Sequence, residues 1–119
     1  MEEINPADRR QHPRTPLDLD IEVSQVQAEG AQDVENIIRC KCRDISGGGI
    51  SFYSMHPYAA QSVLRLHIPL DQTHIKVMGK VTWGKQLPTD PTFVTGVQFL
   101  NIYEHDFEVL CSYIMTKCL

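Results

Sequence analysis

Three arginines in the N-terminal segment DRRQHPR are the first candidates for chemistry: Arg9, Arg10 and Arg14. A guanidinium group stays charged, binds phosphates or the O6/N7 edge of guanine through paired N–H donors, and stacks on flat rings. Pro13 disfavours a helical conformation at His12, so we expect an extended or turned segment. Its arginines can then reach a ligand from separate directions. Taken alone, Arg10 and Arg14 are most simply a solvated surface pair.

A second candidate is the stretch RDISGGGIS, residues 43–51, which places three glycines between two apolar segments. Glycine permits a positive φ and a close approach of other groups, and successive N–H groups can form an anion-binding nest. Asp44 can start a turn by bonding the backbone two residues on. Its carboxylate can also accept from the N1–H and N2–H2 edge of a guanine. A bulge or tight turn between paired strands explains the same residues.

Composition limits the class of protein. The 119 residues, 42% hydrophobic and 22% charged, fit one globular domain with a single core. No apolar run approaches the roughly 20 residues of a membrane helix, and the N-terminus does not resemble a signal peptide. We therefore expect a cytoplasmic protein with no membrane insertion. The formal charge of −4 argues against binding a nucleic-acid polymer, which needs a broad basic surface.

The four cysteines do not follow a common zinc pattern. They are Cys40, Cys42, Cys111 and Cys118, with C-x-C and C-x6-C spacings. We interpret them as reduced thiols, mostly in the core. A metal site or a disulfide is the alternative, and a cytoplasmic location makes a disulfide less favourable.

Hydrophobic periodicity predicts six strands followed by one helix. Residues 1–15 are polar and proline-containing, so we expect an arm without regular structure. Alternation and turn residues predict strands over 17–26, 34–45, 50–55, 62–70, 74–86 and 92–100. From about residue 102 the apolar period changes to that of one helix face; its members are Tyr103, Phe107, Leu110, Cys111, Ile114 and Cys118. The pattern favours a small antiparallel barrel with a helix covering one end.

The two candidate segments together resemble the PilZ domain family. An R-x-x-x-R motif at Arg10 and Arg14 precedes a D-x-S-x-x-G motif at Asp44, Ser46 and Gly49 by about 30 residues. Weaker agreements follow in the strand with Val81 and Trp83, in GVQF over 96–99, and in the C-terminal helix. The resemblance covers residues 8 to 117. It implies a mainly β fold, a six-stranded antiparallel barrel over 16–119 with a C-terminal helix, preceded by a flexible arm over 1–15.

The resemblance also implies a ligand, the bacterial second messenger cyclic di-GMP. By position, Arg10 and Arg14 correspond to the residues that clasp its phosphates and guanine faces. Asp44 and Ser46 correspond to the guanine-edge contacts, and Gly49 to the residue that permits close approach. In similar proteins an arginine at the position of Arg9 accompanies binding of a stacked ligand pair. Alternatively, the Arg9 side chain simply points to water.

The expected function is that of a receptor or adaptor. No P-loop, H-E-x-x-H or G-x-S-x-G motif is present, so we expect no enzyme, no cofactor and no metal. Ligand binding is expected to fold the arm over the barrel and present a new surface to an unidentified effector protein. The sequence is compatible with a monomer and with a homodimer.

Two alternatives remain. One is a PilZ-like interaction module that binds no nucleotide. The other is a barrel that binds single-stranded nucleic acid through basic and aromatic side chains, which the acidic net charge disfavours. Its candidate residues are Arg39, Lys41, Arg43, Phe52, Tyr53 and Trp83.

Overall fold

The computed structural model describes residues 15–16, 19–26, 37–88 and 91–117. In these ranges the chain forms strands and one helix. In chain order they are β1 (Thr15–Pro16), β2 (Asp20–Gln25), β3 (Ile38–Ile45), β4 (Gly49–Ser54), β5 (Val63–Leu70), β6 (Thr73–Gln86), β7 (Phe93–Phe99) and α1 (Glu104–Lys117).

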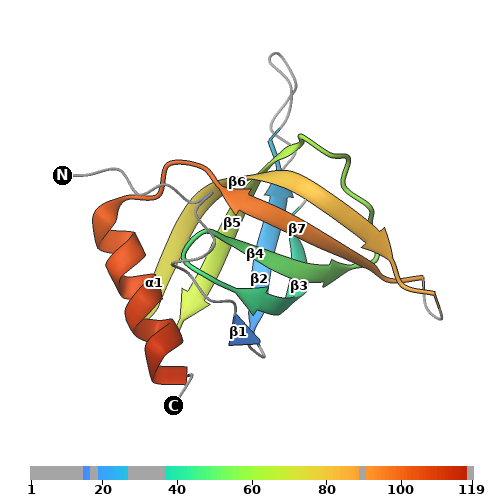
Figure 1. Ribbon diagram of the computed structural model, residues 1–119. Helices are drawn as coiled ribbons and strands as arrows, with labels where there is room; N and C mark the ends of the chain where they lie inside the picture. Colours follow the sequence, from blue (N-terminus) through green and yellow to red (C-terminus); the bar gives the residue numbers. More distant parts are fainter. Residues whose placement is uncertain (1–14, 17–18, 27–36, 89–90, 118–119) are drawn as a thin grey trace.

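The six longer strands close into an antiparallel barrel (Figure 1). Their order is β3-β2-β5-β6-β7-β4, and pairing of β3 with β4 completes the circle. Closure removes the unpaired strand edges that an open sheet would expose. The predicted six-stranded barrel with a C-terminal helix is therefore confirmed.

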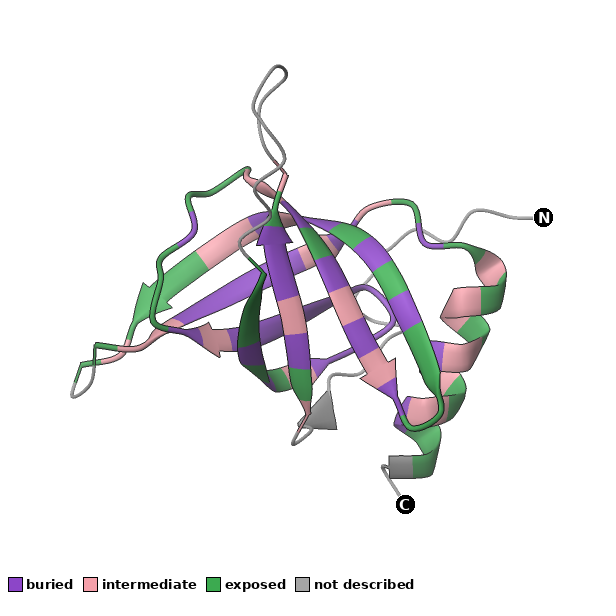
Figure 2. Ribbon diagram, turned by 180° about the vertical axis from the view of Figure 1, so that it is seen from behind, coloured by how far each residue is buried: buried purple, intermediate pink, exposed green. Residues whose placement is uncertain are grey.

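The core lies inside the barrel because the strand residues alternate in burial (Figure 2). On β6, Ile75, Val77 and Val81 face inward between exposed or partly exposed neighbours. Ile21 and Val23 of β2 are fully buried, as their alternation with acidic residues predicts. The largest fully buried side chains are Phe52, Phe99, Ile21, Ile45, Ile50, Leu64, Leu66, Ile68, Ile75 and Leu110.

Helix α1 covers one end of the barrel (Figure 1). Leu110 and Ile114 belong to the buried core, and Phe107 packs against it, so the predicted helix face is largely correct. The sequence period also predicts Tyr103 on this face, but Tyr103 is 75% exposed. It precedes the first helical residue, Glu104, so the helical period does not extend to it.

The two-residue strand β1 changes the predicted boundary of the arm. The sequence places Thr15 in a segment without regular structure, but Thr15 pairs with Ile45 and Pro16 with Asp44. This pairing uses an edge of β3 that β2 leaves open beyond Lys41. Residues 1–14, with the predicted ligand residues Arg9, Arg10 and Arg14, lie outside the described residues.

Candidate functional site

A β-bulge in β3 points Asp44 to the outside of the barrel. Opposite β4, Cys42 pairs with Phe52 and Asp44 with Ser51, so Arg43 is the extra residue. Strict alternation from the inward Cys40 and Cys42 would direct Asp44 into the core. Because of the extra residue, Asp44 lies outside beside Arg43, and Ile45 returns to the core.

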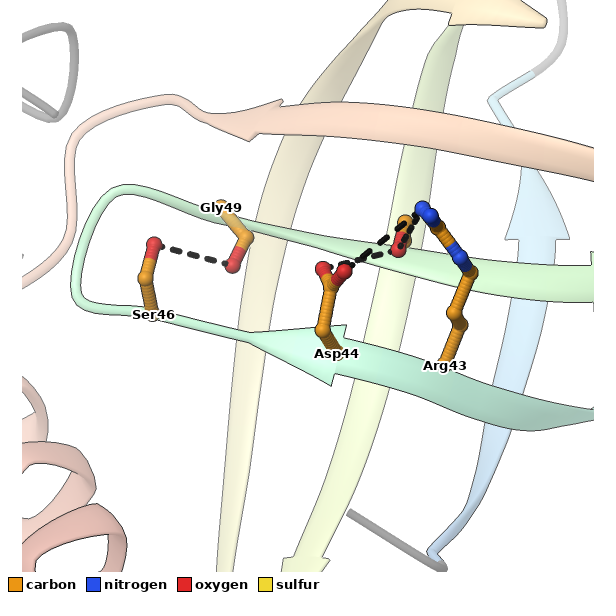
Figure 3. Close-up of polar contacts among 5 residues, drawn as sticks. Arg43, Asp44, Ser46 and Gly49 are labelled. Atoms are coloured by element: carbon orange, nitrogen blue, oxygen red, sulfur yellow. Dashed lines mark hydrogen bonds and ion pairs between the residues drawn. The ribbon is translucent and has the colours of Figure 1, made fainter. Parts of the chain in front are cut away.

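Two neighbouring side chains hold the Asp44 carboxylate (Figure 3). The Ser51 hydroxyl donates to Oδ1 at 2.8 Å, and an Arg43 guanidinium nitrogen lies 3.5 Å from Oδ2. The Asp44 side chain is 15% exposed and that of Arg43 is 44% exposed. The carboxylate is thus oriented at the barrel surface with limited access to water.

Ser46 orders the turn that follows (Figure 3). Its backbone N–H donates to the Gly49 carbonyl at 2.9 Å, and the Gly48 N–H donates to the Ser46 hydroxyl oxygen at 3.2 Å. The hydroxyl is 3.5 Å from the Gly49 carbonyl oxygen, and Ser46 is 3% exposed. In this structure Ser46 stabilises the turn between β3 and β4; its contact with a guanine stays a prediction.

Gly49 is required by the backbone of β7. A Cβ atom built on Gly49 would lie 2.3 Å from the Val97 carbonyl oxygen, a distance that no side chain tolerates. The close approach at this position is therefore between two strands. Whether Gly49 also lets a ligand approach stays a prediction.

A row of paired residues continues from Asp44 across four strands. Asp44 pairs with Ser51, Ser51 with Gly96, and Gly96 with Trp83. A second irregularity in β6, at Thr82, accompanies the outward position of Trp83. The missing side chain of Gly96 leaves room for the indole, since a Cβ there would lie 2.0 Å from Trp83 Nε1.

Arg43 lies over the indole ring at the end of this row. Its guanidinium carbon lies 5.9 Å from the Trp83 ring centroid, which is within the range of a cation–π contact. We call the surface formed by Arg43, Asp44, Ser51, Gly96 and Trp83 the motif face. It combines a carboxylate, a hydroxyl, a guanidinium and an aromatic ring on the outside of the barrel.

The sequence singled out only part of this face. The sequence predicts Asp44 as a cyclic di-GMP ligand. It names Arg43 and Trp83 only for the nucleic-acid-binding alternative and, for Trp83, as a family-like strand residue; it does not single out Ser51. Ser51 could have been found from its place at the end of the glycine-rich stretch. The role of Arg43 depends on the bulge, which alternation does not reveal.

The cysteines on the inner side of β3 are buried free thiols, as predicted. Burial raises the pKa of the Cys40 thiol to about 11. Burial, with the Asp44 charge as a smaller cause, raises the pKa of Cys42 to about 12. Both are therefore protonated at neutral pH and are poor nucleophiles or metal ligands. Cys111 is a free, half-buried thiol whose pKa burial also raises. Cys118 lies outside the described residues.

A groove of about 570 Å³ lies away from the motif face. It runs between the outer side of β2, β5 and β6 and the segment leading into α1, and Met78, Tyr103 and Asp106 help to line it. Asp44, Ser46 and Gly49 do not. In the part of the chain that the structure describes, no helix combines the length and apolar character needed to cross a membrane.

A family model, the PilZ domain, matches residues 8–116. The chain belongs to the PilZ domain family. The match includes both motifs, from Arg10 to Gly49, and extends into α1 as far as residue 116. A search of curated protein sequences found no significant match.

Solved structures share the PilZ fold at low sequence identity. The inhibitor of motility MotI/DgrA of Bacillus subtilis is 24% identical, with a TM-score of 0.74 over 92% of this chain and 51% of its own. The MrkH–c-di-GMP complex of K. pneumonia is 17% identical, with a TM-score of 0.66 over 92% and 52%. The PilZ domain with c-di-GMP of YcgR from Escherichia coli is 15% identical, with a TM-score of 0.60 over 92% and 91%. The chain spans about half the length of MotI/DgrA and MrkH.

One of the stacking residues predicted for the nucleic-acid-binding alternative is not accessible. Phe52 is fully buried in the core, where it meets Tyr58 edge to face with ring centroids 6.0 Å apart. Its alternation with Ser51 and Tyr53 on β4 turns it inward. Base stacking needs an accessible ring, so Phe52 cannot supply it.

Proposed function

We propose that this PilZ protein is a cyclic di-GMP receptor that signals to a partner protein through a ligand-dependent change of its N-terminal arm. The observation that carries the proposal is the pairing of β1 with β3. Thr15 directly follows Arg14 in the sequence and pairs with Ile45, next to Asp44. Consecutive Cα atoms are about 3.8 Å apart, so Arg14 is joined covalently to a strand that borders the motif face.

The chemistry of the motif face suits a guanine. An ionised carboxylate only accepts hydrogen bonds, and the N1–H and N2–H2 groups of guanine form a matching donor pair. The Ser51 hydroxyl keeps one Asp44 oxygen oriented. The Trp83 ring lies near the same carboxylate with Arg43 over it, so a guanine that stacks on the indole must displace Arg43. Arg43 presents N–H donors to Asp44, so a guanine that binds there must share the carboxylate with Arg43 or displace it.

Arg10 and Arg14 supply the charge that the phosphates need. In this proposal they clasp the ligand from the arm while Asp44 holds a guanine edge from the barrel. Ordering of the arm lowers the net affinity and couples binding to a change of surface. Two solved PilZ-fold structures were determined with c-di-GMP, those of MrkH and YcgR, and this supports the choice of ligand.

The test is a calorimetric titration of the protein with cyclic di-GMP at moderate salt. We expect micromolar or tighter binding, with a loss of about 100-fold in Asp44→Ala and in Arg14→Ala. Asp20→Ala, which removes an exposed carboxylate of β2, is the matched control and should bind normally. Cyclic di-AMP is the matched control ligand and should not bind, because adenine lacks the N1–H and N2–H2 donor pair.

The titration also gives the number of ligands bound per protein, and tryptophan fluorescence of the same sample reports on the arm. Two ligands per protein would assign Arg9 to a stacked ligand pair. Trp83 is the single tryptophan of the chain, so its fluorescence reports directly on the motif face. If cyclic di-GMP produces neither binding heat nor thermal stabilisation, a function as a cyclic di-GMP receptor is excluded. The protein would then be a PilZ-fold interaction module that binds no nucleotide.

A further inference from the structure

A chain of hydrogen-bonded side chains crosses the outer side of β2, β5 and β6, away from the motif face. His67 Nδ1 lies 2.9 Å from Glu22 Oε1, and His67 Nε2 lies 2.9 Å from His74 Nδ1. Regular strand pairing brings the three together, since Glu22 pairs with His67 and His74 pairs with Pro69, two residues from His67. We call Glu22, His67 and His74 the histidine face.

The carboxylate sets the hydrogen position on His67. An ionised carboxylate accepts only, so His67 Nδ1 carries the hydrogen that is donated to Glu22. In the neutral ring this leaves the Nε2 lone pair directed at His74. His74 Nδ1 then donates to it. In its other neutral tautomer, His74 carries the hydrogen on Nε2. The lone pairs of His67 Nε2 and His74 Nδ1 are then both free, and neither ring has lost a proton overall.

Two imidazole nitrogens at this separation are within about 0.5 Å of the spacing that a tetrahedral metal ion requires. With metal–nitrogen bonds of about 2.0–2.1 Å, two ligands are about 2.9 Å apart at a right angle and about 3.4 Å apart at the tetrahedral angle. Imidazole suits Zn²⁺, Cu²⁺ and Ni²⁺. We propose that His67 Nε2 and His74 Nδ1 bind a divalent transition-metal ion and that Glu22 orients His67 for this role.

Glu22 occupies the position of a supporting carboxylate. Metal-binding histidines commonly donate their other N–H to a carboxylate, which fixes the ring and raises its basicity. Within the described residues no group of three or more His, Cys, Asp or Glu side chains is arranged to hold a metal. Among the described residues, the proposed site therefore has two protein ligands. His67 and Glu22 also line the groove beside α1.

Lys76 is a neighbouring positive charge that opposes the metal. Lys76 pairs directly with His67 across β5 and β6, and its side chain lies on the same outer side. An ammonium group near a divalent cation weakens binding, whereas the Glu22 carboxylate strengthens it. The two charges flank His67 on opposite strands, so each can be removed separately.

The experiment is a calorimetric titration of tag-free protein with Zn²⁺ at about pH 7.5, with Mg²⁺ as the ion that prefers oxygen ligands. We expect Zn²⁺ to bind one-to-one and Mg²⁺ not to bind. His67→Ala and His74→Ala should each weaken Zn²⁺ binding by more than tenfold, and Glu22→Gln by about tenfold. Lys76→Ala should tighten it. His105→Ala, which removes an exposed histidine of α1, is the matched control and should bind as the wild type does.

Circular dichroism and thermal melts without metal establish that each variant is folded. A Zn²⁺-dependent rise in melting temperature in the wild type and in His105→Ala, absent from His74→Ala, would support the site. Equal binding by the wild type and the His67→Ala and His74→Ala variants would overturn it, as would no Zn²⁺ binding by the wild type. The outcome is independent of cyclic di-GMP binding.

Discussion

The motif face and the histidine face lie on the same barrel, but their strands pair differently. On the motif face, irregular pairing at Arg43 and at Thr82 interrupts the ladders of β3 with β4 and of β6 with β7. On the histidine face, β5 pairs with β2 and with β6 in unbroken register. The bulge in β3 gives two adjacent outward residues, whereas a regular ladder gives one outward residue in two.

The difference affects how each face responds to substitution. The motif face depends on the close contact between Gly96 and the Trp83 indole, on the nearby backbone contact of Gly49 with Val97, and on buried side chains such as Ser51. The histidine face consists of side chains about one third or more exposed, standing on an intact ladder. We therefore expect substitutions on the motif face to affect stability strongly and those on the histidine face to affect it little.

The largest effect is expected for Gly49→Ala, two residues before Ser51 of the motif face on β4. The added methyl group would meet the Val97 carbonyl oxygen, so β4 and β7 must move apart. We expect a loss of about 3 kcal/mol in the free energy of unfolding, measured by urea denaturation. Gly84→Ala is the matched control, because its Cβ would meet only the Val94 carbonyl oxygen at 3.8 Å. Equal effects of the two substitutions would contradict the close contact at Gly49.

Gly96→Ala comes next. Its methyl group would overlap the Trp83 indole, which must rotate away from the motif face. Because a side chain can move more easily than a strand, we expect a smaller loss of about 2 kcal/mol. Tryptophan fluorescence should change in the folded protein, since Trp83 loses its packing on β7. An unchanged spectrum would mean that Gly96 does not set the position of the ring.

Ser51→Ala tests the support of Asp44. The substitution removes the 2.8 Å hydrogen bond to the carboxylate, which we expect to cost about 1.5 kcal/mol of stability. Cyclic di-GMP affinity should fall by about tenfold, because Asp44 is less well oriented. Ser112→Ala, at an exposed position of α1, is the control. Wild-type stability and affinity in Ser51→Ala would assign no supporting role to this hydroxyl.

Glu22→Gln should have the smallest effect on stability. The pair of Glu22 with His67 is partly exposed, with side-chain exposures of 41% and 32%. Water screens such pairs, so we expect a change of no more than about 0.5 kcal/mol without metal. Thermal melts of the metal-free protein measure it. A loss comparable to that in Ser51→Ala would show that the histidine face is as tightly coupled to the fold as the motif face.

The sequence predicted the fold through local patterns. Alternation identified the strands because each residue of a half-buried strand faces either core or solvent, as Ile21 and Glu22 do. The ends were less accurate, as with Thr15 and Tyr103, because pairing and helix start depend on neighbouring elements. Of the predicted ligand residues, Asp44, Ser46 and Gly49 lie together around the turn between β3 and β4. The arm arginines remain predictions outside the described residues.

The sequence by itself determined the residue types, the barrel and the family motifs, since these depend on periodicity and local spacing. Only the tertiary structure decided that Asp44 points outward, because the bulge at Arg43 is defined by the register of β3 against β4. The same is true of Trp83 beside Gly96 and of His74 beside His67. These neighbours are set by pairing between strands, which alternation along a single strand does not specify.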